Sequence, residues 1–391
     1  MKFYIPKQLV EYPKESYMNV IIYETEHFEV AASLIKLFAA GNCNLTLIIN
    51  SRVNEKLSEV FEDGNTQINK IILPKKISRL ALYQTLQKYI DKIQPDLFYL
   101  NTVSSNHILF AWLLKKNKTV RSILTVHAIN CLFEPIPFLG FKKIIRYFGK
   151  RMLVNNVNEF NVISETMTGY LHNKNKKKKT IHNIPGAVFT GQQKNSILSD
   201  VINLVIPGSI DYRRRNYEEV IELIELADKT GLPVNITLAG GYYAEFGEDI
   251  INRMKKLQLV FCSLTIFGKE ELSQSQFEMI LLNSHFIYMP CVINTAICGK
   301  IKEVYGVTMS SGNISDAIQF ARPFIAPRAL RLPQNLISSC MEYSNKDELL
   351  GLLLSLFKKP DSYQKYCDEA LKNSMNYTIE KIRKANPSVF F

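Results

Sequence analysis

The sequence of 391 residues has little of what marks secreted, disulfide-bonded or membrane-spanning proteins. Its seven cysteines include no C-x-x-C pair and their number is odd, which favours reduced thiols over a disulfide framework or a structural zinc site. The N-terminal stretch carries charges and prolines where a signal peptide needs an apolar run. No later stretch reaches the roughly 18 uncharged apolar residues of a spanning helix. We therefore expect a cytoplasmic protein without a transmembrane segment.

Several ligand-binding motifs are absent as well. The chain has neither the G-x-G-x-x-G of dinucleotide-binding folds nor the G-x-x-x-x-G-K-[ST] of P-loop ATPases, which disfavours both classes of enzyme. It has no H-E-x-x-H and no paired D-x-D, so we expect no tightly held metal. It also lacks the RNP, KH, zinc and helix-turn-helix signatures, so nucleic acid is not an expected partner.

Positive charge is what the sequence has in excess. Lys and Arg number 48 against 36 Asp and Glu, which gives a formal net charge of +12 at pH 7. Such a surface favours anions, but the charge alone does not choose among nucleic acid, acidic lipid and phosphorylated small molecules. Hydrophobic residues make up 47% and charged residues 21%, which is typical of a globular protein and excludes a disordered one.

Short apolar, β-branched runs alternate with amphipathic stretches of helical length, which predicts parallel sheets covered by helices on both faces. The predicted strands are 19–24, 44–50, 68–74, 96–101, 122–128 and 160–164 in the first half, and 202–208, 234–241, 263–268, 285–290 and 323–327 in the second. Between the two series, residues 185–200 are rich in Gly, Pro, Gln, Asn and Ser, as linkers are. We expect two Rossmann-like doubly wound α/β domains, 1–190 and 200–360, and a C-terminal helix, 361–391, that returns to the first domain.

Small residues and cations recur at the predicted carboxyl ends of the second domain's strands, where parallel sheets bind ligands. A glycine after the first of these strands lets a phosphate approach the backbone, and nearby arginines can add bidentate contacts to a diphosphate. The alternative is an ordinary turn and a solvated helix entrance with Asn216 as its N-cap. The positions at this edge are Gly208, Ser209, Arg213, Arg214, Arg215, Gly240, Gly268, Lys269 and Gly312.

The order and spacing of these segments resemble a known family. The second-domain segments "LVIPGSIDYRRRNYEEVIEL", "ITLAGG", "LTIFGKEELSQSQFEMILLNSHFIYMP" and "YGVTMSSGNISDAIQFARPFIAP" are similar to the donor-binding half of GT-B glycosyltransferases, most of all the glycogen-synthase-like family 4 group. "ILTVHA" and "NVISETMTGYL" are similar to segments of their acceptor half. The resemblance implies two domains facing a cleft, a nucleotide-sugar donor (a UDP-sugar before others) and no tightly bound cofactor.

The resemblance also implies roles around the donor. Gly208 and Ser209 would lie against its diphosphate, which the arginines would neutralise, and fixed positive charge there stabilises the departing nucleoside diphosphate. The loop at Gly268 and Lys269 would border the base. The positions near the sugar, the ribose or the phosphate would be Glu303, Tyr305, Ser311 and Gly312.

One departure from the family pattern concerns its two glutamates, which usually stand eight positions apart. Asp316 occupies something like the second position, and the residue eight earlier is Thr308. Both retention and inversion of the sugar's configuration therefore stay open. Inversion needs a general base for the acceptor hydroxyl.

Candidates for this base stand at the carboxyl ends of first-domain strands. His127 matches a histidine often found there in the group, and His27 and Glu29 follow the first strand. The alternatives are a hydrogen-bonded structural histidine for His127 and, for Glu29, an acid favoured at a helix N-terminus on structural grounds. We take these three residues and Asp316 as the catalytic candidates.

Two basic stretches in the first domain bear on its partners. Residues 136–152, "IPFLGFKKIIRYFGKRM", mix apolar residues and cations as an interfacial helix on anionic lipid does, although a core-packed helix with a basic face has the same pattern. Residues 173–180, "NKNKKKKT", predict an exposed loop that near a membrane would add attraction. Both suit a peripheral protein at the inner face of the cell membrane.

We therefore predict a hexosyltransferase of cell-surface polysaccharide or glycoconjugate synthesis. It would move a sugar from a nucleotide-sugar donor to a glycan or lipid-linked acceptor. The alternatives are a nucleotide-sugar epimerase, which needs no acceptor site, and a non-catalytic GT-B module that assists a partner enzyme.

Overall fold

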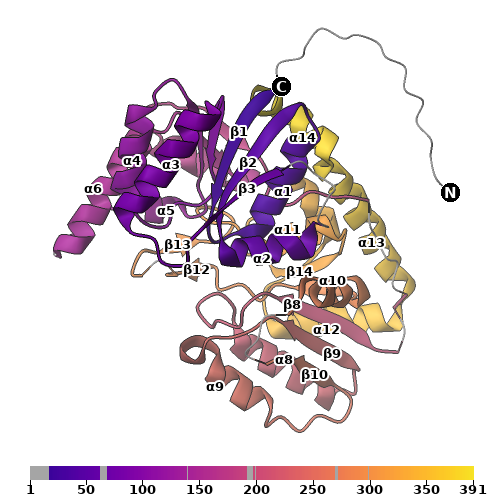
Figure 1. Ribbon diagram of the computed structural model, residues 1–391. Coiled ribbons are helices and arrows are strands. Elements are labelled where there is room, and N and C mark those ends of the chain that lie inside the picture. Colours follow the sequence, from indigo (N-terminus) through magenta and orange to yellow (C-terminus); the bar gives the residue numbers. More distant parts are fainter. Residues whose placement is uncertain are drawn as a thin grey trace, which may run out of the picture.

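A computed structural model describes residues 17–61, 68–138, 140–191, 197–198, 200–268, 272–297 and 299–391. The chain forms two α/β domains, each built around its own sheet (Figure 1). The first sheet has seven strands in the order β3-β2-β1-β4-β5-β6-β7, and the second has six in the order β10-β9-β8-β11-β14-β15. All neighbouring strands in these two sheets pair in parallel. The predicted fold class, two doubly wound Rossmann-like domains, is confirmed.

The first domain contains seven strands and the helices between them. Its strands are β1 (Met18–Glu24), β2 (Cys43–Asn50), β3 (Ile68–Leu73), β4 (Leu97–Leu100), β5 (Arg121–Thr125), β6 (Glu159–Val162) and β7 (Ile181–Asn183). Its helices are α1 (Phe28–Ala39), α2 (Ser51–Val60), α3 (Arg79–Ile93), α4 (His107–Lys116), α5 (Ile129–Leu132), α6 (Phe141–Asn156), η1 (Glu165–Met167) and α7 (Thr168–Lys174).

The second domain repeats the alternation and adds a two-stranded ribbon. Its strands are β8 (Ile202–Pro207), β9 (Val234–Ala239), β10 (Ser263–Ile266), β11 (Phe286–Tyr288), β14 (Phe324–Pro327), β15 (Cys340–Tyr343) and the antiparallel ribbon β12 (Asn294–Thr295) and β13 (Glu303–Val304). Its helices are α8 (Tyr217–Lys229), α9 (Ala244–Met254), α10 (Gln274–Asn283), α11 (Gly312–Gln319), η2 (Gln334–Ser339) and α12 (Lys346–Lys358).

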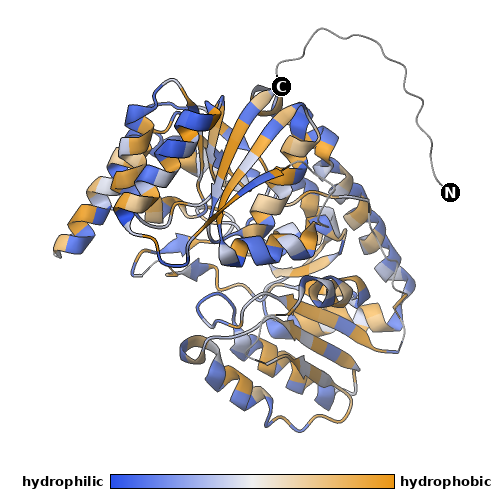
Figure 2. Ribbon diagram, viewed as in Figure 1, coloured by the Kyte–Doolittle hydropathy of each residue, from blue (hydrophilic) through white to orange (hydrophobic). Residues whose placement is uncertain are grey.

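The strands are apolar because helices cover both faces of each sheet. In β1, Ile21 and Tyr23 belong to one core cluster and Val20 and Ile22 to another, so alternate residues serve opposite helix layers. Such a strand has no solvent face, and its sequence runs apolar without interruption. Figure 2 shows apolar strands inside helices that are hydrophilic on their outer faces.

The chain crosses between the domains twice. The first crossing lies in the predicted linker, of which residues 192–196 and 199 lie outside the described part of the chain, while Val188 and Phe189 are buried. The second crossing runs through η3 (Met375–Tyr377). The backbone N–H of Phe189 donates to the carbonyl oxygen of Tyr377 at 2.9 Å, so the two crossings are hydrogen-bonded to each other.

The C-terminal segment consists of α13 (Asp361–Ser374), η3, α14 (Ile379–Ala385) and α15 (Pro387–Phe390). Arg383 donates to the carbonyl oxygen of Leu37 at 2.7 Å, and the ring of Phe390 packs 4.9 Å from that of Phe38, so α14 and α15 lie against α1. None of the described helices is both long enough and apolar enough to cross a bilayer.

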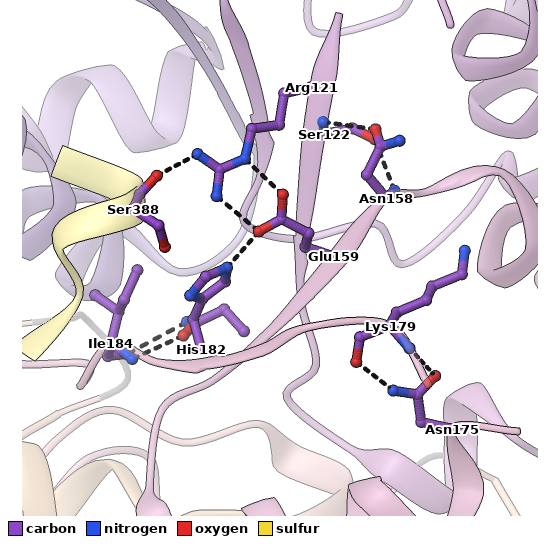
Figure 3. Close-up of polar contacts among 10 residues, drawn as sticks. Arg121, Ser122, Asn158, Glu159, Asn175, Lys179, His182, Ile184 and Ser388 are labelled. Atoms are coloured by element: carbon purple, nitrogen blue, oxygen red, sulfur yellow. Dashed lines mark hydrogen bonds and ion pairs between the residues drawn. The ribbon is translucent and has the colours of Figure 1, made fainter. Parts of the chain in front are cut away.

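A hydrogen bond from an ion-paired arginine of the first sheet fixes this segment. Arg121 binds Glu159 through two hydrogen bonds of 2.5 and 2.7 Å and also donates to the carbonyl oxygen of Ser388 in α15 (Figure 3). His182 is the third partner of this group, through the carboxylate of Glu159. Burial works to raise the pKa of Glu159, but the hydrogen bonds from Arg121 and His182 lower it to about 2. Glu159 therefore stays charged and holds Arg121 in place.

Candidate active site

The turn between β1 and α1 is built around the buried carboxylate of Glu24. One oxygen accepts backbone N–H groups of the residues that follow, at 2.6 Å from Thr25 and 2.9 Å from His27. The other accepts the hydroxyl of Thr102 at 2.8 Å and the amide of Asn101. The carboxylate thus satisfies N–H groups at the entrance of α1 that have no partner within the helix. Glu24 is a structural residue that fixes the position of its neighbours.

The two predicted histidines of the first domain lie together. The rings of His27 and His127 stack with their centroids 4.4 Å apart and their planes at 26°. His127 Nε2 lies 2.8 Å from the carbonyl oxygen of Asn101, so this nitrogen carries the proton and Nδ1 keeps its lone pair. Burial, and next the neighbouring His27, lower the pKa of His127 to about 3. His127 is therefore a neutral imidazole at pH 7.

Two predicted carboxyl groups from different domains interact electrostatically. Asp316 stands in α11 of the second domain, and Glu29 in the first turn of α1. Desolvation raises the pKa of Asp316 to about 7; the charge of Glu29 raises it further, whereas Asn313, 3.3 Å away, and Arg215 lower it. Desolvation also raises the pKa of Glu29, although its side chain has solvent access. A carboxyl group with a pKa near 7 can both give and take a proton at neutral pH.

The loop after β8 turns at a glycine whose backbone is in the left-handed region. Gly208 has φ +85°, a conformation that favours glycine, and its N–H donates to the carbonyl oxygen of Ala239 at 2.9 Å. A Cβ on Gly240 would lie 2.4 Å from the carbonyl oxygen of Gly208. The two loops therefore approach so closely that any side chain at Gly240 would separate them.

The three consecutive arginines have three different environments. Arg213 binds Asp211 at 2.6 Å and stacks on the ring of Phe246, with its guanidinium carbon 3.4 Å from the ring centroid. Arg215 is buried and donates to backbone carbonyl oxygens of the glycine turn, including that of Ser209 at 2.8 Å. Both guanidinium groups thus have structural partners.

Arg214 differs from its two neighbours. Its side chain is 43% exposed, and its ion pair with Asp211 is a loose one, 3.6 Å from Nε to the carboxylate. Its charge also lowers the pKa of Tyr305, which burial raises, so the guanidinium lies near the loop before α11. Among these three arginines, Arg214 has the side chain best placed to meet an anion.

The two domains meet at the loop that carries His127. The buried carboxylate of Glu303 in β13 accepts the backbone N–H groups of Cys131 at 2.6 Å and Asn130 at 3.3 Å, at the start of α5. The N–H of Ile129 donates to the carbonyl oxygen of Thr308 at 2.9 Å. Glu303, which the resemblance places near the sugar or ribose, therefore holds the first-domain loop in this structure.

The remaining predicted donor residues are distributed along the same side of the second domain. Tyr305 is buried, and Ser311 is the N-cap residue of α11. Among the residues that the structure describes, a Cβ added to Gly312 or Gly268 would meet nothing within 4 Å. Lys269 lies outside the described residues. In the described part of the chain, no three His, Cys, Asp or Glu side chains are grouped as metal ligands.

Some site residues were not predicted. Asn101 and Thr102 orient Glu24 and His127, and Asn130 and Cys131 connect the domains. Asn101 and Thr102 directly follow the strand β4 at the same sheet edge as His127, and that position is the signal that could have found them. The N–H groups of Asn130 and Cys131 carry no signal, because every residue type has one.

Residues 27–154 match the family described as "Glycosyl transferase 4-like". The stretch of the first domain from His27 to Val154 is similar to that family. This match covers the segment that holds His27, Glu29 and His127. No curated protein matches the sequence.

Solved structures extend the likeness to both domains. Sucrose-phosphate synthase from Thermosynechococcus elongatus is 12% identical, with a TM-score of 0.65 over 95% of this chain and 98% of that one. HepE from Anabaena, in complex with UDP-glucose, is 10% identical, with a TM-score of 0.64 over 95% and 99%. UDP-GlcNAc 2-epimerase from Neisseria meningitidis, bound to UDP-GlcNAc, is 12% identical, with a TM-score of 0.57 over 95% and 99%.

These structures have the GT-B fold in common with this chain, and the resemblance drawn from the sequence is confirmed. The predicted enzyme class, a glycosyltransferase, is confirmed by the family match of residues 27–154.

Proposed function

We propose that this protein transfers a sugar from a UDP-sugar to a hydroxyl group of a glycan or lipid-linked acceptor in cell-surface polysaccharide or glycoconjugate synthesis. The observation that carries the proposal is the electrostatic coupling of Glu29 and Asp316 across the domain junction, beside the stacked pair His27 and His127. The UDP-glucose bound by HepE supports UDP as the nucleotide of the donor.

The donor diphosphate would lie between the Gly208 turn and the N-terminus of α11. The turn brings backbone close to the phosphates, and the free N–H groups at the start of α11 favour negative charge. Arg214 would add the mobile cation that neutralises the leaving diphosphate. Arg213 and Arg215 would keep the loop in shape rather than bind the donor, because their guanidinium groups already have partners.

The acid–base step would fall to the carboxyl pair. Burial, and in addition the charge of Glu29, raise the pKa of Asp316 to about 7, and burial raises the pKa of Glu29, so the two carboxyl groups can hold a proton at neutral pH and exchange it with a hydroxyl group. His127, with its pKa near 3, is too weak a base for this step. Its Nδ1 lone pair would instead accept a hydrogen bond from a sugar hydroxyl and orient it.

The test combines binding and product analysis on the full chain. Thermal shift with UDP, GDP and CMP and their common sugar conjugates identifies the donor, and we expect stabilisation by UDP compounds. UDP release that increases with added acceptor establishes transfer. A change at C2 of the bound sugar without acceptor would support an epimerase instead, the activity of the Neisseria meningitidis structure. If no nucleotide stabilised the protein, the transferase proposal would fall and a non-catalytic module would replace it.

A further inference from the structure

A cluster of large apolar side chains is exposed on one side of the first domain. Phe138 is 95% exposed and Phe141 78%, and Phe148 in α6 and Trp112 in α4 are each more than half exposed. The smaller members are Ile136 and Ile145. We call these six residues the α6 patch. Figure 2 shows apolar and hydrophilic residues alternating along α6, and Figure 1 shows this helix at the outer side of the domain next to α4.

Trp112 belongs to the patch through the packing of α4 against α6. A Cβ added to Gly149 of α6 would lie 3.0 Å from the side chain of Ile108, so the two helices touch there. Trp112 stands one helical turn beyond Ile108 on the same face of α4. It is the one tryptophan of the sequence. Its fluorescence therefore reports on this patch.

The charges around the patch have one sign. From Ala111 to Met152 the sequence has nine Lys and Arg residues, of which Arg121 is paired with Glu159 and Lys150 is buried, and one acidic residue, Glu134. Glu134 is buried and paired with Arg146 at 3.1 Å and Lys150 at 3.4 Å, so it presents no negative charge to solvent. Lys142 and Lys143 stand beside Phe141 and are exposed. Exposed aromatic side chains within a field of cations match the interface of an anionic bilayer, where both find partners.

We propose that the α6 patch binds the surface of an anionic lipid bilayer and holds the active site over a lipid-linked acceptor. The second half of this inference rests on the proposed function, whereas the binding of lipid does not. A second apolar protein surface would suit the aromatic residues but would leave the cations without partners, so the charges favour the bilayer.

The structure connects the α6 patch rigidly to the active site. Lys150 of α6 donates to the carbonyl oxygen of Cys131 at 2.6 Å. The N–H of Cys131 in turn donates to Glu303 of the second domain. A bilayer that holds α6 therefore also fixes the orientation of α5, which begins two residues after His127. An acceptor in that bilayer would reach the junction without leaving the lipid.

The experiment is co-sedimentation of the full chain with vesicles of phosphatidylcholine alone or with added phosphatidylglycerol, with Trp112 emission recorded in parallel. We expect binding and a blue shift of the emission with the anionic vesicles only. Phe138→Ser combined with Phe141→Ser should weaken binding on the order of tenfold or more. Lys142→Glu combined with Lys143→Glu should weaken it by a similar factor and reduce its salt dependence.

The matched control is Val260→Ser combined with Phe261→Ser, two exposed apolar side chains of the second domain. It should bind vesicles as the wild type does. Equal binding by all variants, or no binding to anionic vesicles by the wild type, would overturn the inference. Stabilisation by UDP is measured on every variant. If UDP does not stabilise the wild type, the proposed function is wrong, whereas the conclusion from the vesicle binding is unaffected.

Discussion

Arg214 stands between two arginines that have structural partners, and its own side chain is open to a ligand. We expect Arg214→Ala to weaken UDP binding by roughly 10- to 100-fold, because a charge-assisted contact to phosphate contributes about 1.5–3 kcal/mol. Isothermal titration with UDP measures the change. Arg253→Ala is the control, since its side chain is 42% exposed in the same domain and pairs with Glu218. Equal affinities of wild type and Arg214→Ala would rule out this role.

Asp316 makes stability depend on pH. Its folded-state pKa of about 7 lies above the value of an unfolded aspartate, about 3.9. Between these values the folded chain keeps a proton that the unfolded chain has lost, so stability falls as pH rises through this window. Asp316→Asn should remove this loss of stability. Its free energy of unfolding relative to that of the wild type should therefore rise by on the order of 2 kcal/mol from pH 5 to pH 8. Urea unfolding at both pH values measures this, and a constant difference between the two proteins would contradict it.

The carboxyl group of Asp316 should also determine how the catalytic rate depends on pH. If the pair of Glu29 and Asp316 exchanges the proton, the rate should change around pH 7, and the Asp316→Asn variant should lose that dependence together with most of its activity. The pH profile of UDP release in the presence of acceptor measures both. An unchanged profile in the variant would assign the proton step to another group.

Residue types at strand ends could be predicted from the sequence, but their contacts could not. His27 and His127 are 100 positions apart, and their stacking depends on β1 and β5 ending at the same sheet edge. The three arginines have identical chemistry and consecutive positions, so only the folded loop distinguishes Arg214 from its neighbours. Glu303 was expected at the donor sugar, and its contact with Asn130 depends on how the two domains pack.

At the scale of elements, the ribbon strand β13 fixes the start of α5 through Glu303. Glu303→Ala should destabilise the protein by about 1–3 kcal/mol, because it removes a buried carboxylate that accepts two N–H groups of half-buried residues. Urea unfolding measures this. Glu165→Ala is the control: Glu165 also accepts a backbone N–H from the other domain, that of Gln334 at 3.1 Å, but it is exposed and should cost less than about 0.5 kcal/mol. Equal effects of the two variants would show that burial does not matter here.

Every predicted strand forms, including the short β11, but β7, β15 and the ribbon strands β12 and β13 were not predicted. β1 and β2 begin within one residue of the predicted positions, because their apolar runs are long and uninterrupted. β7, with three residues and the polar sequence Ile-His-Asn, and β15, Cys340–Tyr343, carry too little pattern to be recognised. The C-terminal segment was expected as one helix, but it breaks after Ser374, and Thr378 caps α14. The amphipathic period continues across this break and hides it.

At the scale of the molecule, the C-terminal segment depends on the fit of Arg383 against the first domain. A Cβ on Gly41 would lie 2.5 Å from this guanidinium, which is buried and hydrogen-bonded to Leu37. We expect Gly41→Ala to lower the melting temperature and to destabilise by about 1–3 kcal/mol. Gly351→Ala is the control, an exposed helix position with nothing within 4 Å, and should stabilise by about 0.5–1 kcal/mol. A neutral Gly41→Ala would mean that Arg383 moves freely.

The two crossings of the chain, joined by the hydrogen bond between Phe189 and Tyr377, have a mechanical consequence. A single linker leaves two domains free to twist, slide and separate. Two linkers that lie side by side restrict these motions. We expect the easiest remaining motion to be a hinge rotation about one axis that keeps both crossings intact. A motion with one degree of freedom returns the domains to the same alignment each time they close. We expect Glu29 and Asp316 to separate along this swing only when the hydrogen bonds of Glu303 to Asn130 and Cys131 also release.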